Sequence, residues 1–435
     1  MNILVLVKNA GVEKSTAFIE VIKILEEMGA YIHIVISNQP DDYVTEQYYY
    51  NSENIIIEFL NQTYHVEGML ERIKDVIRKG EFLEKIVGDI LIWFKCLCFR
   101  VKQRLMQNKD DFAYDEFLNN MMIKYEIDEE YDYIWTTDEY SLLWAEWIRQ
   151  KCEKDIKIVY HCLELYWEHF CMPSQKKWRH SREYVLFEKA QKILHKTNII
   201  IIQDEKRWEV LCQYTGLNRN AEKVLLPVSI KDYKGKKKYS LHDRLGINRE
   251  KKIIFYPTLI AKKRGCMELI QMSEGLKSSF ITVIHGFCAI QGFSDKLRKH
   301  ADQFKVIISN TTFGYQELID MHQEVWCVFL YYGETDNNDK YIANSSNKLA
   351  MSLQAGKPII TIGNQMLNEL CEEYKCGIGL MEWSETEFLK AIEDIDKKYD
   401  VYSENARRCY EEKYDIELYK KTLHDVLFRK AKSND

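Results

Sequence analysis

One segment of the sequence, residues 344–363, has residue types that suit anion binding. Its pattern predicts a helix over 348–355, ended by Gly356 and followed by a strand that Pro358 opens. Three residues that commonly cap helices precede it, namely Ser345, Ser346 and Asn347. The first turn of a helix presents unpaired amides and Lys348 adds a cation, so this helix end could hold a diphosphate such as that of a sugar nucleotide. An ordinary capped helix between two strands is the alternative.

A basic loop is a second candidate anion site. Lys262, Lys263 and Arg264 follow an apolar run at residues 253–256. The planar guanidinium of Arg264 would fit phosphate oxygens and neutralise a departing diphosphate. A solvated basic loop is the alternative.

His161 and Glu164 come at the end of another apolar run, residues 156–160. A carboxylate there could accept a hydrogen bond from a substrate hydroxyl, and a histidine could act as a base or orient a sugar. For His161, a structural histidine at a strand end is the alternative.

The first half of the chain alternates short apolar runs with helical patterns. Strands are predicted at 3–7, 31–36, 55–57, 133–136, 156–160 and 199–202, and helices at 15–28, 142–151 and 184–196. Runs this short and apolar suit parallel strands that are covered on both faces. Residues 1–230 are therefore predicted to form a Rossmann-like domain, with a helical insertion at about 64–125.

The same alternation restarts after a lysine-rich linker at 231–238. Strands are predicted at 253–256, 280–284, 306–308, 325–330, 358–362 and 377–380, with helices between them. Residues 231–414 thus form a second α/β domain, and an amphipathic helix at 415–435 ends the chain. Two such domains leave a cleft at the carboxyl ends of their sheets, where a nucleotide-linked substrate would bind.

Composition argues against several classes of function. Lys and Arg number 61 against 67 Asp and Glu, a net charge of −6, so a basic nucleic-acid-binding surface is not expected. The twelve cysteines form no CxxC pair, so neither a zinc site nor a secreted disulfide framework is expected. With no signal-peptide pattern and no apolar run of ~18 residues, we expect a cytoplasmic protein.

Residues 86–105 carry an apolar stripe at helical spacing, flanked by basic residues. Such a helix could lie on the inner face of an anionic membrane. Packing in a protein core is the alternative.

The segment SSNKLAMSLQAGKPII at 345–360 resembles the nucleotide-binding element of glycosyltransferase family 4, which reads approximately SPNKLFEYMAAGKPVI. The likeness extends over nearly the whole chain. KKIIFYPTLIAKKRGCMELI, VIHGF, YQELIDMH and IVYHCLELY stand where that family has comparable elements. The resemblance implies the GT-B fold, with two Rossmann-like domains, an interdomain cleft and a C-terminal helix that crosses back to the first domain.

The resemblance also implies site residues. It makes Arg264 and Lys348 catalytic through the diphosphate, with Glu164 and His161 on the acceptor side. It assigns donor binding to Thr258, Gly265, Gly286, Asn344, Ser345, Ser346, Asn347 and Met351.

Some of these positions depart from the family pattern. Two glutamates seven residues apart are common in the family, and counting back from Gly356 places Asn344 and Met351 there. Asn344 can still bond a sugar hydroxyl, whereas Met351 offers only a weak acceptor. Thr258 replaces the usual glycine of the first turn, so the backbone there would approach the phosphates less closely.

From these features the sequence predicts a hexosyltransferase-like glycosyltransferase. It would move a sugar from a nucleotide-sugar co-substrate to a saccharide or lipid-linked acceptor, as in surface polysaccharide biosynthesis, and needs no other cofactor. No DxD-type pair is placed to hold a metal, and the cations and helix amides could carry the charge instead. The resemblance implies retention of configuration. A catalytically degenerate GT-B subunit and a sugar-nucleotide epimerase are the alternatives.

Overall fold

The computed structural model describes residues 1–9, 15–38, 52–59, 131–152, 155–168, 182–233, 238–288, 292–311, 313–333 and 336–428. The chain forms two units. The first comprises Met1–Lys14, Ile22–Leu225 and His424–Asp435, and the second comprises Ser15–Val21 and Leu226–Leu423. The predicted insertion at 64–125 and the apolar stripe at 86–105 lie outside the described residues.

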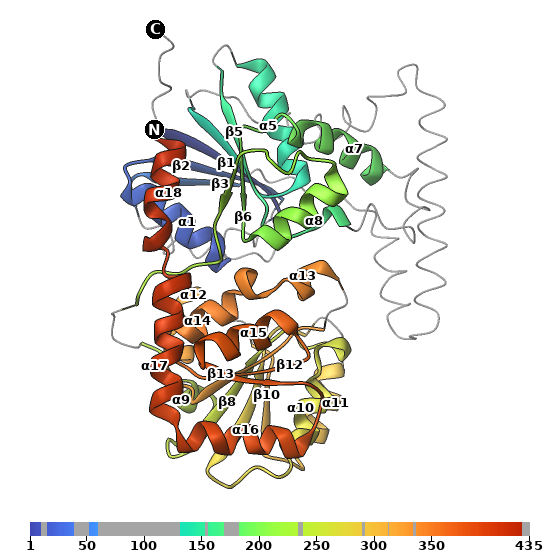
Figure 1. Cartoon of the computed structure of the whole chain (residues 1–435), viewed down its shortest axis with the longest axis vertical. Helices are drawn as coiled ribbons and strands as arrows, with labels where there is room; N and C mark the ends of the chain where they lie inside the picture. Colours follow the sequence, from blue (N-terminus) through green and yellow to red (C-terminus); the bar gives the residue numbers. More distant parts are fainter. Residues whose placement is uncertain are drawn as a thin grey trace. The chain divides into compact units, whose positions relative to one another are not determined.

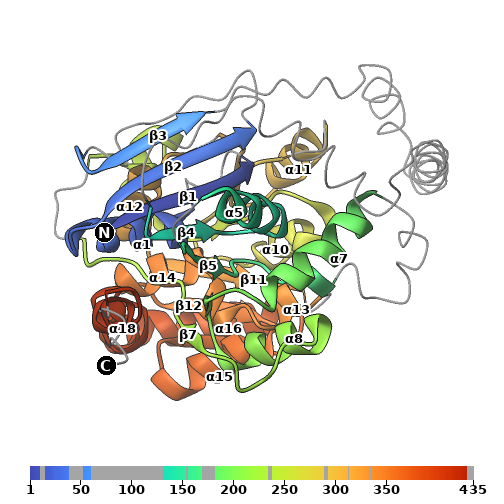
Figure 2. The ribbon, with the colours of Figure 1, turned by 90° about the horizontal axis from the view of Figure 1, so that it is seen from above.

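The first unit contains a seven-stranded parallel sheet of order β3-β2-β1-β4-β5-β6-β7. Figure 2 shows β3, β2, β1, β4 and β5 in succession. Its strands are β1 Asn2–Asn9, β2 Tyr31–Asn38, β3 Ile55–Phe59, β4 Tyr133–Thr136, β5 Lys157–His161, β6 Ile199–Ile202 and β7 Lys223–Leu225. The helices between them are α1 Thr16–Glu27, α5 Glu139–Lys151, α7 Arg182–Leu194 and α8 Glu205–Thr215. In the central strand β1, consecutive residues from Ile3 to Val7 are buried, which confirms a sheet that is covered on both faces.

The second unit contains a six-stranded parallel sheet of order β10-β9-β8-β11-β12-β13. Figure 1 labels its strands β8, β10, β12 and β13. Its strands are β8 Lys252–Pro257, β9 Phe280–His285, β10 Val306–Ser309, β11 Cys327–Tyr331, β12 Ile359–Ile362 and β13 Gly377–Leu380. Its helices are α9 Leu241–Leu245, the 3₁₀ turn Lys262–Arg264, α10 Cys266–Met272, α11 Phe293–Ala301, α12 Tyr315–Glu324, α13 Asn337–Lys340, the 3₁₀ turn Ala343–Ser345, α14 Asn347–Gln354, α15 Gln365–Tyr374, α16 Glu385–Lys397, α17 Tyr399–Cys409 and the π turn Tyr410–Tyr414. Helix α18, Glu417–Leu427, follows.

Alternate residues of β8 pack on opposite faces of the second sheet. Tyr256 joins the core beneath α10, α11 and α16, where Phe388 is fully buried. Phe255 packs edge-on against His322 of α12 at a ring-centroid distance of 5.4 Å. Helices therefore cover both faces, and the two-sheet α/β class that the sequence predicts is confirmed.

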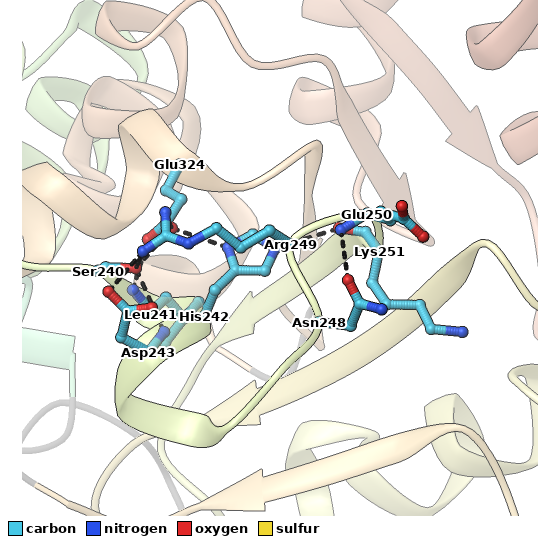
Figure 3. Close-up of polar contacts among 9 residues, drawn as sticks. All are labelled: Ser240, Leu241, His242, Asp243, Asn248, Arg249, Glu250, Lys251 and Glu324. Carbon is cyan, nitrogen blue, oxygen red and sulfur yellow. Dashed lines mark hydrogen bonds and ion pairs between the residues drawn. The ribbon is translucent and has the colours of Figure 1, made fainter.

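Helix α9 is anchored by one largely buried carboxylate at the end of α12 (Figure 3). Glu324 accepts hydrogen bonds from the Ser240 hydroxyl at 2.7 Å, from His242 Nδ1 at 2.8 Å and from the Leu241 amide. His242 Nε2 lies 3.1 Å from the carbonyl oxygen of Lys251, at the start of β8. The chain that enters the second unit is thereby tied to its sheet.

Substituting Glu324 with alanine is expected to lower the free energy of unfolding by about 1 to 3 kcal/mol, because buried donors lose their acceptor. Burial raises the pKa of Glu324, but the bonds from Ser240, His242 and Leu241 outweigh it and lower the pKa below its ordinary 4.5. A carboxyl group whose pKa is lowered by folding stabilises the folded state at pH values above 4.5. This stabilisation is lost as the pH falls below 4.5. Urea unfolding at pH 7 and pH 4 tests this: the variant's deficit should shrink in acid. Asp243→Ala is the matched control, since Asp243 pairs with Arg249 at the surface.

Candidate functional site

The carboxyl ends of the second sheet's strands carry most of the predicted donor-binding residues. Because all six strands are parallel, these ends share one edge. Thr258 follows β8, Gly286 follows β9 and Tyr332 follows β11. The 3₁₀ turn with Arg264 and the start of α14 belong to the loops that continue from this edge.

Arg264 is held by a carboxylate. Its Nη1 lies 3.0 Å from Asp339 Oδ1 and 3.3 Å from Oδ2, and both side chains are largely buried. The main chain around this pair is also fixed, since Tyr256 donates its hydroxyl to the Arg264 carbonyl at 2.6 Å and Asn364 donates to the Asp339 carbonyl at 2.9 Å. Arg264 is therefore a positioned cation and not a solvated loop residue.

Lys348 shares this environment. Its ammonium lies 5.5 Å from the centre of the Tyr332 ring. Burial lowers the pKa of Lys348 to about 8; the positive charge of Arg264 acts in the same direction and Asp339 opposes it. The structure thus places Lys348, at the N-terminal turn of α14, within electrostatic range of the Arg264–Asp339 pair.

This pKa predicts a pH dependence of anion binding. The ammonium of Lys348 is charged below about pH 8 and neutral above it. The dissociation constant of a diphosphate such as pyrophosphate should therefore rise between pH 7 and pH 9, and proton uptake on binding should appear near pH 8 as a dependence of the calorimetric heat on the buffer. Lys348→Met should flatten the profile. An unchanged dissociation constant over this range would exclude a phosphate contact by Lys348.

In the absence of ligand, the lowered pKa of Lys348 affects the free energy of unfolding, and this effect has the opposite dependence on pH to that of anion binding. A lysine whose folded pKa lies below its unfolded value of 10.5 binds fewer protons when folded, so this group makes stability rise with pH between about 8 and 10.5. A bound diphosphate should remove that gain, because it favours the charged ammonium.

The start of α14 is capped as the sequence predicts. The Ser346 hydroxyl accepts a hydrogen bond from the Leu349 amide at 3.1 Å and contacts the Tyr332 hydroxyl at 2.7 Å. Asn347 is the first helical residue. The Ser345 hydroxyl, at the end of the 3₁₀ turn, faces the carbonyls of Tyr341 at 3.4 Å and Ile342 at 3.3 Å, just before that turn.

The two positions that depart from the family pattern are both engaged by protein. The Asn344 carbonyl accepts from the Val228 amide at 2.8 Å, and its side-chain oxygen lies 3.4 Å from the Tyr414 hydroxyl. Met351 is 3% exposed on α14. Their contacts with a donor remain predictions.

Close backbone packing occurs at Gly286. This residue has φ of +153°, and a Cβ added to it would lie 1.7 Å from the Thr258 carbonyl oxygen. The turns after β8 and β9 are therefore in direct backbone contact, which only a glycine at 286 permits. Gly265 has φ of +64°, and a Cβ added to it would clash with the ring of Trp383.

Gly286→Ala is expected to destabilise the second unit by about 2 to 4 kcal/mol, because two backbone turns must separate. Gly292→Ala is the matched control, since Gly292 also has positive φ, +78°, but nothing within 4 Å of an added Cβ. Thermal unfolding should show a much larger fall in melting temperature for the first variant. Equal falls would mean that φ strain alone, and no contact with Thr258, explains the glycine.

In the first unit, His161 is the last residue of β5 and is buried. Its ring packs edge-on against Trp135 at 5.7 Å between centroids, and burial lowers its pKa to about 3. His161 is therefore neutral at pH 7. Glu164 is exposed in the loop that follows.

A buried arginine fixes the main chain before Glu164. Arg207 donates from Nε to Gln203 Oε1 at 2.7 Å and from Nη2 to the Leu163 carbonyl at 3.2 Å. Gln203 donates in turn to the Cys162 carbonyl at 2.7 Å. The residue pattern around Arg207 does not indicate this role, because the contact with the loop is tertiary.

Glu139 is a candidate that the sequence pattern did not reveal. It begins α5, after Thr137 and Asp138, which follow β4, and it is buried. Burial, and then the charge of neighbouring Asp138, raise its pKa to about 7. A carboxyl group with such a pKa is suited to proton transfer near neutral pH. The one sequence signal is an acidic pair immediately after a strand.

Two kinds of feature are absent among the described residues. No group of three or more His, Cys, Asp or Glu side chains there is arranged to hold a metal ion. None of the helices described is both long enough and apolar enough to cross a membrane.

No protein-family model matches the chain, and no curated protein sequence matches it. Solved structures do. Sucrose-phosphate synthase from Thermosynechococcus elongatus aligns with a TM-score of 0.61 at 12% identity, covering 99% of this chain and 98% of that one. Anabaena HepE in complex with UDP and glucose aligns with 0.62 at 13% identity, covering 98% and 99%. WaaG, a glycosyltransferase involved in lipopolysaccharide biosynthesis, aligns with 0.56 at 12% identity, covering 99% and 100%.

The chain has the GT-B fold. The similarity extends over the whole length of these glycosyltransferases, so both Rossmann-like units are accounted for. At 12 to 13% identity the likeness establishes the GT-B fold alone. The reaction must therefore be inferred from the residues of the site.

Proposed function

We propose that this GT-B protein is a glycosyltransferase that uses a nucleotide-sugar donor. The observation that carries the proposal is the cluster of Arg264 and Lys348 around Asp339 at the first turn of α14. Two cations and one carboxylate leave one net positive charge there, and the positive end of the α14 dipole adds to it. HepE, which shares the fold, was solved in complexes with UDP and with UDP-glucose, which supports the same class of donor here.

The chemical burden of such a transfer is departure of the nucleoside diphosphate. Charge develops on the phosphate oxygens as the bond to the sugar breaks, so fixed cations assist this step. Arg264 would supply a planar two-donor contact and Lys348 a point charge. We propose that this set of groups works without a metal ion. The acceptor would be a saccharide or a lipid-linked saccharide, and the configuration would be retained.

A donor panel tests the function. Calorimetry with UDP, GDP, ADP and their sugar conjugates should show one preferred nucleotide. Mass spectrometry should then show slow release of free sugar from the matching donor in the absence of acceptor. Failure of every nucleotide to bind would reject the proposal.

A second function is favoured by one observation. Asn344 and Met351 occupy positions at which the resembling family commonly has glutamates, and neither can act as a carboxylate. A GT-B subunit that binds a nucleotide sugar without turnover would show tight donor binding and no sugar release or transfer in the same panel.

A further inference from the structure

Two apolar side chains are exposed next to each other at the carboxyl edge of the second sheet. Leu259 is 43% exposed and Phe287 is 63% exposed. They belong to the turns that follow β8 and β9. Thr258 and Ile260 are at most 5% exposed, so the turn after β8 is packed on either side of Leu259.

The two side chains are neighbours because the parallel ladder of β8 and β9 continues into these turns. The Thr258 amide donates to the His285 carbonyl at 2.8 Å. Two residues on, the Ile260 amide donates to the Phe287 carbonyl, also at 2.8 Å. This pattern pairs Leu259 with Phe287, in continuation of the register of the two strands. Single apolar side chains on a surface are common, but these two form one patch, which we call the 259/287 patch.

Two lysines follow Leu259 in the same loop. Lys262 and Lys263 are exposed and belong to the 3₁₀ turn that ends at Arg264. The Tyr256 hydroxyl donates to the Arg264 carbonyl at 2.6 Å, so this loop starts and ends at the edge of the sheet. Leu259 and the cation Arg264 are therefore parts of one short loop. Apolar surface beside ammonium groups complements a ligand that has an alkyl chain and an anionic head.

The size of the 259/287 patch limits what can bind to it. A stable protein partner covers about 800 Å², and two partly exposed side chains provide much less. At an anionic membrane each nearby lysine raises the association constant only about fivefold, and the whole chain carries a net charge of −6. A single lipid chain with its phosphate needs no larger surface than this one.

We propose that the 259/287 patch binds the lipid phosphate of a lipid-linked acceptor. The alkyl or isoprenoid chain would lie on Leu259 and Phe287, and its phosphate would contact Lys262 and Lys263. This inference rests on the proposed function, because it takes the lipid to be the carrier of the acceptor saccharide. Of a free saccharide and a lipid-linked one, it selects the second.

Octyl phosphate, kept below its critical micelle concentration, is the probe that tests this. Calorimetry with the full-length protein should show binding at least about tenfold tighter than that of inorganic phosphate, because apolar surface is removed from water. Leu259→Ser combined with Phe287→Ser should remove most of this difference and leave the dissociation constant of UDP unchanged. Since both side chains are exposed, the melting temperature should remain that of the wild type.

Met381→Ser is the matched control. Met381 follows β13 and is 80% exposed, and β13 lies three strands from β8 in the same sheet, hence roughly 14 Å away. This variant should bind octyl phosphate as the wild type does. An equal loss in Met381→Ser, or no loss in the double serine variant, would overturn the proposal, because either result means binding without a defined site.

Two further arms identify where and in what form the lipid binds. The titration is repeated with saturating UDP, and loss of octyl phosphate binding there would place the probe in the donor site and overturn the proposal. Sedimentation with phosphatidylglycerol vesicles without any binding of octyl phosphate would overturn it in favour of a membrane surface. Lys262→Ala combined with Lys263→Ala should weaken octyl phosphate by about fivefold, as loss of two exposed cations predicts.

Failure of this inference differs from failure of the proposed function. Absence of UDP binding by the wild type rejects the nucleotide-sugar donor. Unchanged octyl phosphate binding in the double serine variant, with UDP still bound, rejects the 259/287 patch alone.

Discussion

Replacing Arg264 with alanine is expected to weaken binding of UDP by about 10- to 100-fold, because a charge-assisted contact with phosphate is worth about 1.5 to 3 kcal/mol. Turnover with a nucleotide sugar should fall at least as far, since the charge on the diphosphate grows as it departs. Calorimetry with UDP measures the first effect and single-turnover sugar release the second. The loss should exceed that from an exposed lysine, because Asp339 already holds the guanidinium in place.

Two further variants make this result specific. Lys263→Ala removes an equal charge from the neighbouring, exposed position and should change UDP binding by less than about threefold. Arg264→Lys keeps the charge but loses the planar fork, so it should recover part of the affinity. If Lys263→Ala weakened UDP as much as Arg264→Ala, the effect would be one of net charge, and the assignment of a built phosphate site would be wrong.

The features that could be predicted from sequence are local. Short apolar runs such as Ile3 to Val7 and 253–256 are buried on both faces, and period and length alone indicate such strands. The cap at Ser346 is equally local, because its partner is the Leu349 amide three residues on.

The features that escaped prediction depend on tertiary contact. Asp339 lies on a four-residue helix with no pattern of its own, and its role comes from Arg264, 75 residues away. The raised pKa of Glu139 and the lowered pKa of Lys348 require knowledge of burial, which residue types do not supply. The contact between Arg264 and Asp339 also excludes the interpretation of Arg264 as part of a solvated basic loop.

Glycine positions show the same division. The resemblance to glycosyltransferase family 4 points to Thr258, where that family usually has a glycine. The structure places the close approach at Gly286, whose missing side chain makes room for the Thr258 carbonyl. The residue type alone can indicate a turn. Which backbone atoms lie against that turn depends on how two strands pack side by side.

Ending the chain after Tyr414 is expected to abolish soluble, cooperatively folded protein. In the second unit this removes Ile416, whose amide donates to the Ile230 carbonyl at 3.2 Å, and Leu423; both side chains are 1% exposed. In the first unit it removes Leu427, whose carbonyl accepts the Tyr133 hydroxyl at 2.7 Å.

Each buried aliphatic side chain of this kind is worth about 2 to 5 kcal/mol, and a domain has about 5 to 15 kcal/mol in total, so three together exhaust most of it. Solubility, urea unfolding and UDP-dependent melting measure the loss. A chain that ends after Phe428 keeps α18 and is the matched control, which should retain the wild-type melting temperature. Wild-type solubility and UDP binding after truncation at Tyr414 would show that α18 is dispensable, and that the crossing helix predicted from the sequence has no structural part in this protein.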